Sequence, residues 1–217
     1  MLRFGPDTGP IVIAALPLFE EANRTRAFVV TILRALASRG IAGALPDLPG
    51  QGESLLPTDE ATLATLSDAF AAATASLARP AYSLAIRSGA LLDAKAALIA
   101  RYHLSPMTGA DLRRELVRTR QASARESGEP FDAASIDKST CPVELSGNLI
   151  APQLLRELVD AVPHEPARTV RLDTEAKPAD AKLSGSPLWR RAEPDNDLAF
   201  ATGIAENIAN WIATCAG

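Results

Sequence analysis

An arginine occupies the position at which one segment of this chain should carry a nucleophile. The segment AYSLAIRSGALL, residues 81–92, predicts a short apolar strand, a tight turn of small residues and a helix start. This is the layout of a nucleophile elbow, with Ala85 and Gly89 in its two small positions and Arg87 at its centre. A guanidinium stays protonated and offers no usable lone pair, so Arg87 cannot attack a carbonyl group. The segment therefore predicts a turn suited to covalent catalysis without the residue that would perform it.

A cation at this position needs compensation. The start of a helix is unfavourable for positive charge, and the turn predicts a positive φ, which costs about 1–3 kcal/mol for a residue other than glycine. One interpretation is a structural ion pair between Arg87 and either Glu20 or Glu21. The other is that Arg87 presents its five donors to an anionic ligand, such as a carboxylate, a phosphate or a sugar acid. The residues alone leave both interpretations open.

The stretch LPLFEEANRTR, residues 16–26, follows the first predicted strand, where an oxyanion hole would take a backbone N–H. Pro17 has no N–H, so Leu18 or Phe19 would have to supply it. Glu20 and Glu21 would repel a developing oxyanion but would neutralise Arg87. Their alternative role is favourable charge at a helix N-terminus.

Further polar residues are expected beside Arg87. The glycine-rich loop DLPGQGES, residues 47–54, follows the second predicted strand, and Asp47 could either reach the site or cap local amides. Ligands of open parallel sheets bind beyond the carboxyl ends of the strands. The predicted ligand-binding set beside Arg87, Glu20 and Glu21 is completed by Asn23, Asp47, Gln51 and Trp189.

A catalytic triad needs a histidine in the loop before the last helix, and that loop, residues 187–196, has none. The only histidines are His103, directly after a predicted core strand, and His164, in a predicted surface loop. An alternative catalytic site would pair Ser88 with His103, since a nucleophile and its base need only hydrogen-bond distance. Otherwise Ser88 would cap the helix after the elbow.

These segments sit in an alternation of strands and helices. Continuous apolar runs predict buried strands, and stretches with helical spacing of apolar residues lie between them. Such alternation predicts an α/β fold with a doubly wound, mostly parallel sheet. Between 105 and 163 the pattern becomes a helical insertion. The predicted strands are 11–16, 41–45, the elbow strand, 96–100 and 169–172; the main predicted helices are 58–77, 111–125, 151–162 and 196–213.

Several of these strings together resemble one protein group. EEANRTR after the first strand, DLPGQGES, the Arg87–Ser88–Gly89 elbow, PMTG at 106–109 and PLW at 187–189 resemble the α/β-hydrolase-like proteins associated with bacterial exosortase systems. The resemblance covers most of the chain but is poor over 127–141 and 175–185. It implies a three-layer αβα sandwich with a small lid, and a group in which arginine at the elbow is usual. It implies no substrate.

Composition bounds the remaining possibilities. The length of 217 residues predicts a single domain, and the net charge of −4 favours neither nucleic acid nor an anionic membrane. No Cys/His spacing suggests a metal site, no cofactor is expected, and no segment is long enough to span a membrane, so a cytoplasmic protein is expected. Three functions stay open: binding of an anionic small molecule or protein partner, ester or thioester hydrolysis through Ser88 and His103 (or through acids such as Glu21 and Asp47), and a non-catalytic role in exosortase or exopolysaccharide assembly.

Overall fold

The chain folds around a seven-stranded sheet, seen in a computed structural model that describes residues 1–215. The strand order is β1-β3-β2-β4-β5-β8-β9, and only the edge pair β1–β3 is antiparallel. The strands are β1 (Leu2–Phe4), β2 (Ile11–Ala15), β3 (Ala42–Leu45), β4 (Ala81–Ile86), β5 (Leu98–Leu104), β8 (Arg168–Leu172) and β9 (Ala181–Leu183).

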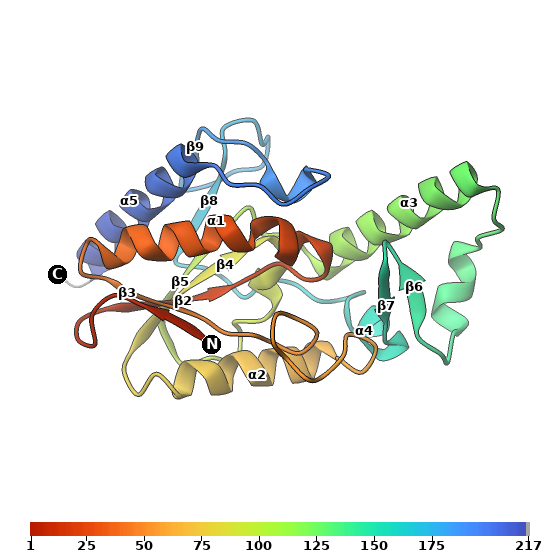
Figure 1. The fold of residues 1–217 in the computed structure, drawn as a ribbon, viewed down its shortest axis with the longest axis horizontal. Helices are drawn as coiled ribbons and strands as arrows, with labels where there is room; N and C mark the ends of the chain where they lie inside the picture. Colours follow the sequence, from red (N-terminus) through yellow and green to blue (C-terminus); the bar gives the residue numbers. More distant parts are fainter. Residues whose placement is uncertain (216–217) are drawn as a thin grey trace.

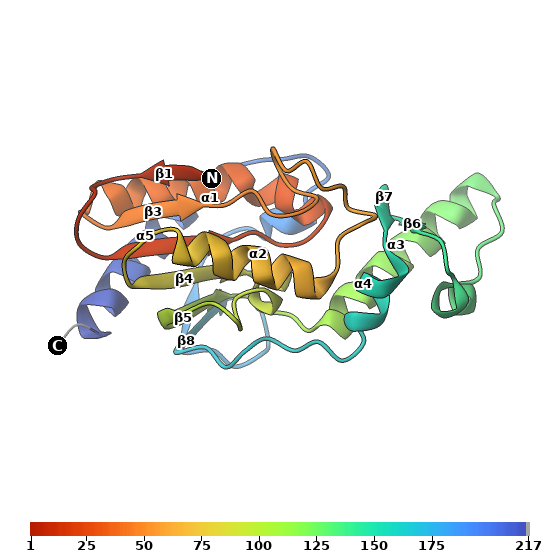
Figure 2. The same ribbon diagram turned by 90° about the horizontal axis from the view of Figure 1, so that it is seen from below.

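Helices cover both faces of the sheet, which gives three layers (Figure 1). Helices α1 (Glu20–Ala37) and α5 (Leu198–Cys215) lie on one face, and α2 (Leu63–Ala75) lies on the other (Figure 2). Because side chains alternate along a strand, Val12 and Ala14 of β2 pack on the α1/α5 side, whereas Ile13 packs on the α2 side. Both faces are buried, so the strand sequence is continuously apolar, as in parallel sheets generally.

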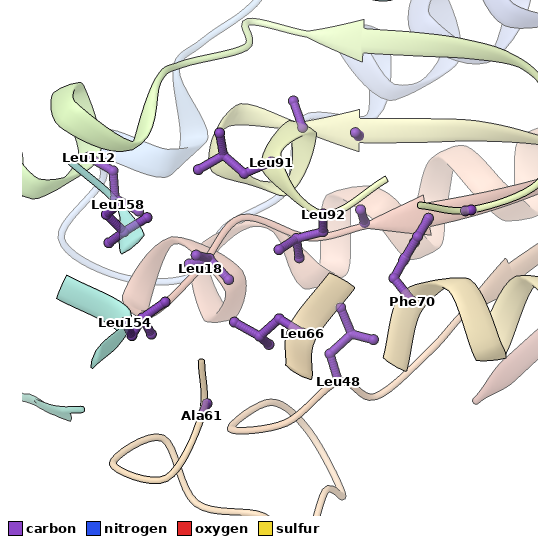
Figure 3. Close-up of a cluster of buried hydrophobic side chains, with 14 of the residues drawn as sticks. Leu18, Leu48, Ala61, Leu66, Phe70, Leu91, Leu92, Leu112, Leu154 and Leu158 are labelled. Atoms are coloured by element: carbon purple, nitrogen blue, oxygen red, sulfur yellow. The ribbon is translucent and has the colours of Figure 1, made fainter. Parts of the chain in front are cut away.

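The insertion extends past the carboxyl ends of the parallel strands (Figure 1). It consists of α3 (Gly109–Ser127), the 3-10 helix η2 (Ala133–Lys138), the hairpin β6 (Val143–Leu145) and β7 (Asn148–Ile150), and α4 (Pro152–Glu157). Its apolar side chains share one cluster with the α2 side of the sheet. Figure 3 shows Leu112, Leu154 and Leu158 of this region continuing the cluster that includes Leu18 and Leu66.

The three-layer α/β architecture is confirmed, and several predicted boundaries are wrong. Helix α2 begins at Leu63 rather than at 58, because the Thr62 side chain accepts the Thr65 amide and caps it. The elbow is followed by a short 3-10 helix, η1 (Arg87–Leu91), instead of a full helix. The stretch 175–185, in which the sequence predicted no strand, contains the partly exposed edge strand β9.

None of the helices within residues 1–215 is long and apolar enough to cross a membrane.

Candidate active site at the strand ends

The sharp turn after β4 has the geometry of an elbow. Arg87 is its central residue and has a positive φ of 55°, as the sequence predicted. Gly89 lies so close to the end of β2 that a Cβ there would stand 2.4 Å from the carbonyl oxygen of Ala15 and 2.7 Å from that of Leu16. The turn therefore requires glycine at this position. It places Arg87 beyond the carboxyl ends of the strands.

Two carboxylates bind the Arg87 guanidinium. Glu21, in the first turn of α1, accepts from Nε at 3.3 Å and from Nη2 at 3.1 Å. Glu115, on α3, accepts from Nη2 at 3.0 Å and 3.3 Å. The ring of Trp189, in the 3-10 helix η3 (Leu188–Arg190), lies 5.3 Å from the guanidinium carbon in a cation–π contact. The predicted ion pair with Glu21 is present, and Trp189 comes from the loop in which a triad would carry its histidine.

Burial differs sharply within this cluster. The side chains of Arg87 and Glu21 are 9% and 14% exposed, whereas that of Glu115 is 46% exposed. Burial raises the pKa of Glu21, and the nearby charge of Glu115 adds to the rise, although Arg87 partly offsets it. Burial also opposes the charge of Arg87, but the two carboxylates together outweigh it and raise the pKa of the guanidinium. The cluster is thus a permanent cation held by one buried and one half-exposed carboxylate.

Two cavities lie beside the cluster. The first, of about 570 Å³, is lined by the apolar residues Leu18, Phe19, Leu112 and Leu116 and by polar residues that include Glu20 and Glu21. The second, of about 410 Å³, opens onto Arg87 between α3 and the segments after β8 and β9. Four residues line both cavities and form the wall between them: Glu115, Arg118, Trp189 and Arg190.

Cations outnumber acids around the second cavity. Most of the cations have partners: Arg171 forms an ion pair with Glu175, and Asp111 forms ion pairs with both Arg114 and Lys177. Arg118 and Arg190 form no ion pair within the described part of the chain. The six basic and three acidic residues that line this cavity are Arg87, Arg114, Arg118, Arg171, Lys177, Arg190, Asp111, Glu115 and Glu175. This excess favours an anion in the cavity.

Ser88 is fully buried and its hydroxyl oxygen already accepts a hydrogen bond. Its Oγ accepts the Leu18 backbone N–H at 2.9 Å, and η1 has no side-chain cap, so the prediction that Ser88 caps this helix is wrong. Leu18 was one of two predicted oxyanion-hole donors, and its N–H is already committed to this bond. Ser88 ties the loop after β2 to the elbow.

His103 belongs to a separate buried cluster. Its Nε2 lies 3.0 Å from Oδ2 of Asp93, which also accepts from the Ser83 hydroxyl at 2.7 Å. All three side chains are inaccessible to solvent, and neither His103 Nδ1 nor Asp93 Oδ1 has a hydrogen-bond partner. No hydrogen bond joins Ser88 to His103 among residues 1–215, so the structure does not assemble the alternative catalytic pair.

The other predicted site residues lie apart from Arg87. Asp47 binds Arg26 at 2.9 Å and the N-terminal amine at 3.2 Å, and although burial opposes its charge, these contacts lower its pKa. Gln51 donates to the Pro17 carbonyl at 3.0 Å, which joins the loops after β2 and β3. Asn23 is exposed on α1. None of Asn23, Asp47 and Gln51 lines either cavity.

Sequence reasoning missed Glu115, Arg118 and Arg190. They lie on α3 and after β9, at least 28 residues along the chain from Arg87, and the one available signal was the strong charge of α3, which begins shortly after β5. Across residues 1–215 no three His, Cys, Asp or Glu side chains are grouped closely enough to hold a metal ion.

Comparisons with known proteins identify the fold. No model of a protein family matches the chain, and no curated protein matches it. Among solved structures, Est1E of Butyrivibrio proteoclasticus, with ferulic acid bound, is 17% identical with a TM-score of 0.60, over 96% of this chain and 91% of that one. Mouse alpha/beta hydrolase domain-containing protein 10 is 15% identical with a TM-score of 0.61, over 98% and 93%. The bottromycin epimerase BotH, in complex with bottromycin A2, is 14% identical with a TM-score of 0.51, over 99% and 91%.

Proposed function

Since the chain has the α/β-hydrolase fold and an arginine-centred site, we propose that it binds an anionic small molecule and is not a standard serine hydrolase. The observation that carries this proposal is the buried Arg87 at the elbow, beside a cavity rich in cations. A guanidinium supplies charge-assisted hydrogen bonds and no nucleophile, so the chemistry suited to this turn is anion recognition.

The geometry leaves part of Arg87 free for a ligand. Arg87 donates hydrogen bonds from Nε and Nη2 to Glu21 and from Nη2 to Glu115, whereas its Nη1 makes no hydrogen bond within the described residues. Arg87 lines the second cavity, where Arg118 and Arg190 also lack carboxylate partners among residues 1–215. A purely structural ion pair would not need these additional cations. They support the ligand interpretation alongside the ion pair with Glu21.

Thermal unfolding in the presence of small anions tests the proposal. Acetate, octanoate, citrate, sulfate and inorganic phosphate are compared at constant ionic strength. A bound anion at ten times its Kd should raise Tm by roughly 3–5 °C in a protein of this size. Arg118→Gln and Arg190→Gln should each reduce the rise. Arg125→Gln, on the same helix as Arg118 but outside both cavities, should leave it unchanged. No rise with any anion would refute the proposal.

Hydrolysis through Ser88 and His103 is the alternative. One contact supports it, that between His103 and Asp93, because a carboxylate orients the base of a hydrolytic triad. Against it, both side chains are buried and no hydrogen bond joins Ser88 to His103 among residues 1–215. A fluorophosphonate probe and a panel of p-nitrophenyl esters test it directly. Our proposal expects no labelling of Ser88; labelling that disappears in Ser88→Ala would establish the hydrolase instead.

An assembly role in an exosortase or exopolysaccharide system is the second alternative, and it rests on the sequence resemblance. The fold tolerates such departures from hydrolysis, since folds of this kind host unrelated functions and one structural neighbour is named as an epimerase. Loss of surface-protein sorting on deletion of the gene, restored equally by the wild type and by Arg87→Met, would favour an assembly role that needs no anion site.

A further inference from the structure

Glu115 occupies the outer side of the Arg87 guanidinium as a ligand would. Both of its oxygens lie within 3.3 Å of Nη2, and it reaches Arg87 from α3, which belongs to the insertion and not to the sheet. Glu21, by contrast, takes the Nε–Nη2 edge from the first turn of α1. The two carboxylates of Arg87 therefore come from different parts of the fold.

Exposure separates an exchangeable partner from a fixed one. The Glu115 side chain is 46% exposed and that of Glu21 is 14% exposed, so Glu115 can return to water at much lower cost. Glu115 also uses one guanidinium nitrogen, whereas a carboxylate on the Nη1–Nη2 edge would make the parallel two-bond arrangement that arginine favours. An incoming carboxylate could thus replace Glu115 with better geometry.

Glu115 is also part of the wall between the two cavities. Arg87 and the excess of cations line the cavity on one side, and the apolar residues Leu18, Phe19, Leu112 and Leu116 line the cavity on the other. Displacement of Glu115 from Arg87 would remove from this wall the one of its four residues that hydrogen-bonds the guanidinium. A molecule with an anionic head and an apolar tail is complementary to these surfaces, because its head could contact Arg87 while its tail contacts the apolar residues of the first cavity.

We infer that the ligand is a carboxylate with an apolar chain. Its carboxylate displaces Glu115 from Arg87, and its chain lies in the first cavity against Leu112 and Leu116. This inference rests on the proposed function and specifies its ligand. Glu115 is then an internal competitor: it holds the site while the ligand is absent and restricts entry to molecules that can replace its charge.

Calorimetric titration of acetate, hexanoate and octanoate into the full chain tests the inference, with octylamine as the probe of opposite charge. Binding should tighten with chain length, by up to roughly fourfold for each methylene that becomes fully buried. Glu115→Gln removes the competing charge and should tighten octanoate binding roughly three- to tenfold. The matched control is Asp111→Asn, one turn earlier on α3, which lines the second cavity without contacting Arg87.

The outcomes separate this inference from the proposed function. Equal tightening in Glu115→Gln and Asp111→Asn would show a general electrostatic effect and overturn the competition. Binding of phosphate or sulfate without octanoate would overturn the ligand class while the anion-binding function stands. Octylamine binding as tightly as octanoate would overturn the role of the anionic head. If none of the anions binds any variant, both the inference and the proposed function fail.

Discussion

Replacing Arg87 by methionine tests whether the ion cluster determines the stability of this end of the fold. Methionine keeps an unbranched chain at the same backbone position, so the main change is loss of the cation. Glu21 then stays 14% exposed without its main partner. Removing one member of a buried ion pair costs about 3–5 kcal/mol. We expect the free energy of unfolding to fall by about 3 kcal/mol, at the lower end of this range, because the half-exposed Glu115 can turn to solvent.

The loss should depend on pH in a defined direction. Burial already raises the pKa of Glu21 above its ordinary value of 4.5, so the folded protein retains this proton where the unfolded chain has released it. Stability contributed at this residue therefore falls as pH rises from 4.5 towards the folded pKa. Without Arg87, the pKa of Glu21 should rise further, so the pH range over which stability falls should extend to higher pH. Arg87→Met should thus cost more at about pH 7.5 than at about pH 5.

Urea unfolding followed by circular dichroism measures the free energy of unfolding of the wild type and the variant at both pH values. The double variant Arg87→Met/Glu21→Gln removes both charges and should recover about 2 kcal/mol of the loss. Arg190→Met, a cavity residue outside any ion pair of the described chain, serves as the control and should change stability by less than about 0.5 kcal/mol. A double variant no more stable than Arg87→Met, or a loss independent of pH, would refute the reasoning.

Three further substitutions address the surrounding framework. Ser88→Ala leaves the buried Leu18 N–H without an acceptor and should cost about 1–3 kcal/mol in urea unfolding, with no change in ester hydrolysis. Gly89→Ala places a methyl group 2.4 Å from a carbonyl oxygen of β2 and should destabilise by at least about 3 kcal/mol, seen as a drop in Tm of several degrees; a wild-type Tm would rule out the packing described. His103→Phe removes the ring nitrogen that contacts Asp93 and should destabilise by about 2–4 kcal/mol, and adding Asp93→Asn should restore part of this if the two act as a pair.

The parallel sheet could be predicted because central strands such as β2 are apolar along their whole length, and the helices between the strands repeat apolar residues at helical spacing. The edge strand β9 and the extent of η1 could not. Strand β9 is half exposed, so its composition resembles that of a loop, and η1 ends at Leu91 after five residues. Such boundaries depend on packing, which local sequence does not encode.

The sequence by itself determined the sharp turn after the strand, the arginine at its centre, the positive φ there and the pairing candidates Glu20 and Glu21. These follow from the chemistry of single residues and from spacing along one or two strands. Only the tertiary structure decided that Glu21 rather than Glu20 holds the guanidinium, that Glu115 joins it, and that His103 pairs with Asp93 instead of Ser88. The physical reason is distance along the chain: a salt bridge acts over a few ångströms, and the fold alone brings residues 21, 87, 115 and 189 within that range.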